Sequence, residues 1–87
     1  MVKLFATGFL AEKGLECDCC VSVVRIKANV CAGNETQARE LIKEPYSNVQ
    51  IKSLEDKGEV NKDPGINVIA RDEIFKGYYR DSLLYGP

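Results

Sequence analysis

The chain has 87 residues, enough for one domain (residues 1–87) around one modest hydrophobic core. The net charge is −1 and both signs are mixed along the sequence, which argues against binding to duplex nucleic acid or an anionic membrane surface. No run approaches the ~20 apolar residues that a membrane-spanning helix needs, and we expect a cytoplasmic protein.

The first predicted element is a strand over residues 2–11. This stretch has about the length of the apolar region of a signal peptide, but it contains Thr7 and Gly8, and charged residues follow directly at Glu12. Apolar residues occupy most positions on both faces of the predicted strand. We therefore interpret the stretch as a strand that is covered on both sides.

A second strand is predicted over residues 20–32, where β-branched and polar residues alternate. Its even-numbered positions are the more apolar face: Val24, Ile26, Ala28 and Val30. Only a short connection separates the two strands, which favours an antiparallel hairpin.

A helix is predicted over residues 35–44. Asn34 is a favourable N-cap, and Gln37 stands at the position that completes a capping box. Pro45 disfavours helical geometry at the preceding residue and ends the helix. The apolar residues recur with helical spacing on one face: Ala38, Leu41 and Ile42.

Residues 48–54 alternate again and predict a third strand, followed by a turn over 55–58 and a second turn over 61–65. Residues 66–70 predict a fourth strand. Beyond Arg71 the segment 72–84 fits a helix or a strand equally well, because Gly77 interrupts the helical pattern and two adjacent tyrosines suit a strand.

The predicted fold class is therefore α+β, with a four-stranded, mainly antiparallel sheet in the order β-β-α-β-β and one helix packed on one face. The pattern Asn-Glu-Thr-Gln-Ala-Arg-Glu-Leu-Ile at 34–42, after a strand and a polar turn, resembles the small β-β-α-β-β accessory proteins of phages and other mobile genetic elements. The likeness covers residues 20–52. It implies a compact binding protein whose partner is another protein, and it assigns no site residues.

Four cysteines invite comparison with a zinc site: Cys17, Cys19, Cys20 and Cys31. The spacing C-x-C-C with one distant cysteine differs from paired C-x2-C knuckles, and an extended strand would separate Cys20 from Cys31 by roughly 36 Å. We expect no metal and no disulfide between these two residues. A metal, thiol or small-ligand function of the Cys17–Cys20 cluster, or of a cleft in a dimer, remains the alternative.

Catalysis is not expected. The sequence has no histidine, which is the commonest general base, and no glycine-rich phosphate loop. Neighbouring carboxylates at 55–56 and 72–73 are better explained as solvated turns. No catalytic residue and no cofactor is assigned.

One short helix can cover only one face of a four-stranded sheet, so we expect a second apolar face that needs a partner. The predicted partner is a second copy in a homodimer, with another protein as a further option; the competing arrangement folds the C-terminal segment over this face within one chain. The residues assigned to the contact are Phe5, Phe9, Val21 and Val23, together with the aromatic and basic group Tyr78, Tyr79 and Arg80.

Overall fold

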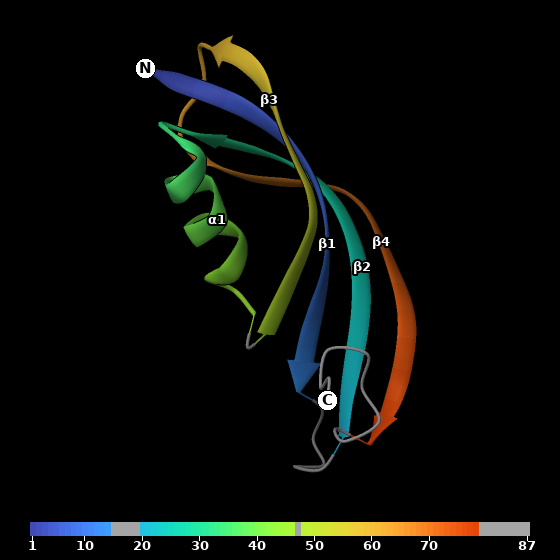
Figure 1. The fold of residues 1–87 in the computed structure, drawn as a ribbon. Coiled ribbons are helices and arrows are strands. Elements are labelled where there is room, and N and C mark those ends of the chain that lie inside the picture. Colours follow the sequence, from blue (N-terminus) through green and yellow to red (C-terminus); the bar gives the residue numbers. More distant parts are fainter. Residues whose placement is uncertain (15–19, 47, 79–87) are drawn as a thin grey trace.

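The computed structural model describes residues 1–14, 20–46 and 48–78, and it has the predicted order of elements. Figure 1 shows one antiparallel sheet with one helix against one of its faces, so the α+β fold class is confirmed. The elements are β1 (Val2–Gly14), β2 (Cys20–Ala32), α1 (Glu35–Lys43), β3 (Asn48–Val60) and β4 (Gly65–Tyr78).

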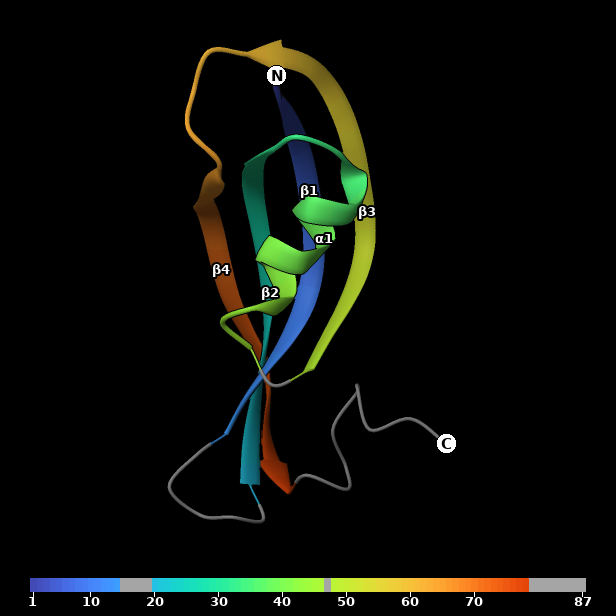
Figure 2. The same ribbon diagram turned by 90° about the vertical axis from the view of Figure 1, so that its left-hand side faces the viewer.

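The strands lie in the order β3-β1-β2-β4, so β3 and β4 form the two edges. β1 and β2 form the predicted antiparallel hairpin. β2 and β3 are both antiparallel to β1 and therefore parallel to each other, and α1 lies in the connection between them. Residues 61–64 then lead from one edge strand to the other across the end of the sheet (Figure 2).

The hairpin register corrects the predicted distribution of apolar residues. Phe5 lies opposite Val30 and Phe9 opposite Ile26, so odd positions of β1 share a face with even positions of β2. Both phenylalanines therefore lie beneath α1 instead of on the face with Val21 and Val23. The prediction was wrong because both faces of β1 are apolar, so the sequence pattern did not define the register.

The core lies between α1 and the sheet. Ala38 and Ile42 of the helix are fully buried, and Leu41 packs against the same cluster, which confirms the predicted helix face. The remaining buried members are contributed by the two central strands: Phe5, Phe9, Ala11, Ile26, Ala28, Val30 and Ala32. Side chains of β3 and β4 border this cluster, so both edge strands are attached to one core.

The start of α1 has the predicted cap. Asn34 Oδ1 accepts a hydrogen bond from the Gln37 backbone N–H at 2.8 Å. Gln37 Oε1 reaches back to the backbone N–H of Gly33 at 2.6 Å, one residue before the usual partner in a capping box. At the other end Glu44 keeps helical angles despite the following Pro45, and its N–H bonds to the Glu40 carbonyl.

β3 is longer than predicted, because residues 55–58 form a β-bulge instead of a turn. The pairing with β1 shifts between Lys3 and Phe5, and Gly58 adopts a φ of 98°. The backbone N–H of Gly58 donates to Asp56 Oδ1 at 2.8 Å. Residue types that favour a turn are used here to bend a continuous strand.

β4 extends to Tyr78, which settles residues 72–78 as strand. Two bulges interrupt its pairing with β2, with Ile69 and Ile74 as the extra residues. These two irregularities explain why the alternation of this segment did not predict one continuous strand. The rest of the predicted C-terminal segment, from Tyr79 onward, lies outside the described residues.

The helix α1 has nine residues and is about 14 Å long, against roughly 43 Å for a strand of 13 residues. It therefore covers only part of one face of the sheet. Within the described residues there is no helix long and apolar enough to cross a membrane.

Candidate functional site

The first candidate surface is the outer edge of β4, which we call the β4 edge and define as residues 65–70. These six residues carry no charge, and the edge of a sheet exposes backbone groups that can pair with another strand. Val68 is 38% exposed and Ile69 55% exposed, which is unusual for large apolar side chains. Ile69 is the extra residue of a bulge and has no pairing partner in β2.

The opposite edge, β3, is charged over residues 52–59. Lys57 Nζ pairs with Glu55 Oε2 at 2.8 Å, and Lys3 Nζ pairs with Asp56 Oδ2 at 3.3 Å. The hydrogen bond and charge of Lys57 lower the pKa of Glu55, while Glu55 raises the pKa of Lys57. Charged side chains of this kind prevent another strand from adding to an edge.

The second candidate surface is a hollow of about 480 Å³. The residue pairs that form most of its lining belong to the sheet face opposite α1. Its floor is low because Ala6 and Gly8 of β1 and Ala70 of β4 have small side chains or none. Residues from both edge strands form its sides: Ser53, Glu55 and Lys57 of β3, and Ile69 and Asp72 of β4.

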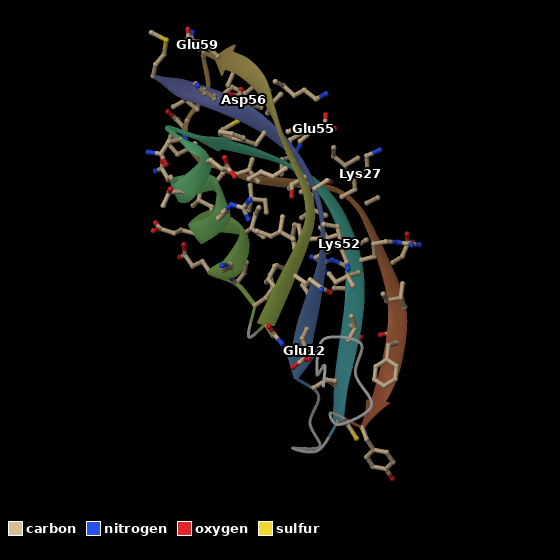
Figure 3. The ribbon with its side chains drawn as sticks, in the orientation of Figure 1. Glu12, Lys27, Lys52, Glu55, Asp56 and Glu59 are labelled. Atoms are coloured by element: carbon tan, nitrogen blue, oxygen red, sulfur yellow. The ribbon has the colours of Figure 1, made fainter. Side chains whose placement is uncertain are left out.

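The charges around this hollow are unevenly compensated. Glu55 is paired with Lys57, and Arg25 lies directly opposite Asp72 in the strand register. Lys27 instead lies between Gly8 on β1 and Ala70 on β4, neither of which carries a charge. No residue in the described part of the chain forms an ion pair with Lys27. Figure 3 shows Lys27 and Glu55 on the side of the sheet away from α1.

A polar connection holds β3 against β1 beside the hollow. The hydroxyl of Thr7 donates to the Ser53 carbonyl at 2.7 Å, and the backbone N–H of Gly8 donates to Ser53 Oγ at 3.1 Å. These bonds lie at a second bulge of β3, where the register shifts between Gly8 and Phe9. They join β3 to β1 on this side of the hollow.

The residues predicted for a dimer contact are not brought together. Phe5 and Phe9 are only 4% and 1% exposed and belong to the core beneath α1. Val21 and Val23 point to the other face, as expected, but both are buried as well. None of these four side chains is therefore available at the surface.

The aromatic and basic group is described only in part. Tyr78 is 56% exposed at the end of β4, and Tyr79 and Arg80 lie outside the described residues.

The cysteines that the structure describes are also apart. Cys20 and Cys31 lie near opposite ends of β2, and both are half-buried. Cys17 and Cys19 lie outside the described residues. Among residues 1–14, 20–46 and 48–78 no three metal-binding side chains gather at one place.

The sequence interpretation missed Lys27, Val68 and Ile69 as surface candidates. A signal for the last two existed, because Ile-Asn-Val-Ile-Ala at 66–70 is the only predicted strand without a charged residue. The hollow had no such signal, since it depends on which small residues of β1, β2 and β4 become neighbours.

Comparison with known proteins gives no match to a protein family model, to a curated protein or to a solved structure.

Proposed function

We propose that this protein is a non-enzymatic interaction module that associates with a second copy of itself, and that the two copies pair through the β4 edge. The observation that carries the proposal is the uncharged edge at residues 65–70 with Val68 and Ile69 exposed. Addition of a strand to such an edge is a common mode of protein recognition.

A second copy is the partner that this edge fits best. A contact across a two-fold axis places the same segment against itself, so like charges within the segment would repel. Residues 65–70 carry none. The proposed dimer thus keeps the expectation of an unpartnered apolar surface but moves the contact from the sheet face to the β4 edge.

The proposed location is the cytoplasm. An origin among the accessory proteins of mobile elements, suggested by residues 34–42, is compatible with a binding role.

The test is sedimentation of the wild-type chain beside Val68→Lys. Val68 is exposed and does not line the hollow, so a lysine there places like charges face to face in the dimer while leaving the other surface intact. We expect a wild-type dimer and a roughly 100-fold weaker association of the variant, which corresponds to about 2.7 kcal/mol.

The matched control is Gln50→Lys, which adds the same charge to an exposed position on the β3 edge and should leave the dimer unchanged. Ile69→Lys serves as a second variant, and circular dichroism verifies that each protein is folded. A wild-type chain that remains monomeric at about 100 μM, or a dimer that resists both lysines, contradicts the proposal.

A further inference from the structure

We propose that the hollow on the sheet face opposite α1 binds a small organic molecule with one negative charge, held by Lys27. The inference goes beyond self-association, because the hollow lies within one chain. Its volume of about 480 Å³ is in the range of small-molecule sites.

The charge of the ligand follows from the side chains that line the hollow. Three are cationic and two are anionic: Arg25, Lys27 and Lys57 against Glu55 and Asp72. The Glu55–Lys57 ion pair removes one charge of each sign, and Asp72 lies opposite Arg25 in the strand register, although no ion pair joins these two among the described residues. Lys27 is left as one uncompensated ammonium group, which matches one carboxylate or sulfonate.

The apolar part of the ligand is inferred from the residues on the floor and on one side of the hollow. Ala6, Gly8 and Ala70 leave room above the strands, and Ile69 adds an exposed apolar side chain. A flat apolar group can rest on these residues while its acidic group reaches Lys27. Asn29 and Ser53 offer hydrogen-bonding groups on the same lining.

Two features indicate that this hollow is built into the fold. The Ser53 side is fixed to β1 by the bonds from Thr7 and Gly8, at 2.7 and 3.1 Å. A Cβ added at Gly8 would lie 3.2 Å from Ser53 Oγ, so this hydroxyl would have to move by a few tenths of an ångström. A larger residue at position 8 would displace the side of the hollow that these bonds position.

The experiment uses two fluorescent probes with closely similar ring systems. One is 1-anilinonaphthalene-8-sulfonate, which carries one negative charge, and the other is the neutral N-phenyl-1-naphthylamine. We expect saturable binding of the sulfonate, one molecule per chain. Amide NMR shifts should be concentrated at Gly8, Lys27 and Ala70.

Two substitutions test separately the charge of Lys27 and the free volume of the hollow. Lys27→Gln should weaken binding of the sulfonate about fivefold and leave the neutral probe unchanged, because it removes the charge and keeps a polar side chain that is only one atom shorter. Ala70→Leu should weaken both probes by filling the hollow at an exposed position. Lys62→Gln, the same charge change in the 61–64 loop, is the control that should alter neither.

The inference is contradicted if Lys27→Gln leaves sulfonate binding unchanged, if Ala70→Leu has no effect, or if the NMR shifts map to another surface. The measurements are repeated on Val68→Lys. Retained binding in that variant establishes that the hollow acts independently of the proposed dimer, whereas loss of binding there contradicts a site within one chain.

Discussion

The two edge strands of this sheet, β3 and β4, both expose backbone groups that could pair with another strand, but they differ in the charge of their side chains. β3 and β4 are of nearly equal length, each is interrupted by two bulges, and each borders the same core. Over residues 52–59, β3 carries five charged side chains: Lys52, Glu55, Asp56, Lys57 and Glu59. The β4 edge carries none. The charged residues of β4 are confined to positions 71–76, so the two edges differ in where their charges lie and not in their bulges, and charge decides which stretch can accept another strand.

Removal of the β3 charges should have the largest effect on assembly. The triple variant Glu55→Thr, Lys57→Thr and Glu59→Thr removes three of these five charges and keeps Lys52 and Asp56, so that β3 as well as β4 would be more open to pairing. A chain that can pair through both edge strands does not stop at a dimer. We therefore expect open-ended, concentration-dependent assemblies in sedimentation and light scattering.

The control for this experiment removes the same charges elsewhere. Glu35→Gln, Arg39→Gln and Glu40→Gln change the exposed side of α1 by the same total and should leave the assembly state as it is. If the triple threonine variant sediments like the wild type, the β3 charges are not what blocks this edge.

The bulge of β3 should respond more than the start of β4 to a change of glycine. Gly58→Ala forces a side chain into a backbone conformation with φ of 98°, which costs about 1–2 kcal/mol. Gly65→Ala meets open space and has no such φ, so stability should stay within about 1 kcal/mol of the wild type.

Urea unfolding of the two glycine variants measures this difference. Equal losses of free energy at both positions would mean that the positive φ of Gly58 is not what holds the bulge in place.

The smallest expected effect concerns the acid response of β3. The Gly58 N–H, and to a lesser extent Lys3, lower the pKa of Asp56. A carboxyl group with a lowered folded-state pKa stabilises the fold above its unfolded value near 3.9, and this contribution is lost as the pH falls through the folded value.

Carboxyl NMR titration follows Asp56 directly. Lys3→Gln should return its pKa only part of the way to the ordinary value, because the hydrogen bond from Gly58 remains. A complete return in Lys3→Gln would assign the effect to the ion pair instead.

The order of elements could be predicted from the sequence because each has a local signal. Asn34 and Gln37 mark the helix start, and the β-branched residues of 20–32 mark β2. The faces of the hairpin could not be predicted, since β1 is apolar on both sides and its register with β2 depends on the whole sheet. The predicted contact through Phe5 and Phe9 failed for this reason.

The extent of the edge strands was underestimated for a related reason. Glu-Asp-Lys-Gly at 55–58 has the composition of a turn, and only the pairing of β3 with β1 turns it into a bulge. The hollow was beyond prediction because Gly8, Lys27 and Ala70, which are adjacent across three strands, are distant in sequence.

The connection over residues 61–64 has a consequence for exchange of strands between molecules. From Val60 to Gly65 the chain can span at most roughly 17 Å, and the two edge strands are separated by three strand spacings, about 14 Å along the sheet. A chain lacking Lys62 and Asp63 would reach only about 10 Å. Its β4 could then complete the sheet of a neighbouring molecule more readily than its own, so the length of this loop keeps the fold within one chain.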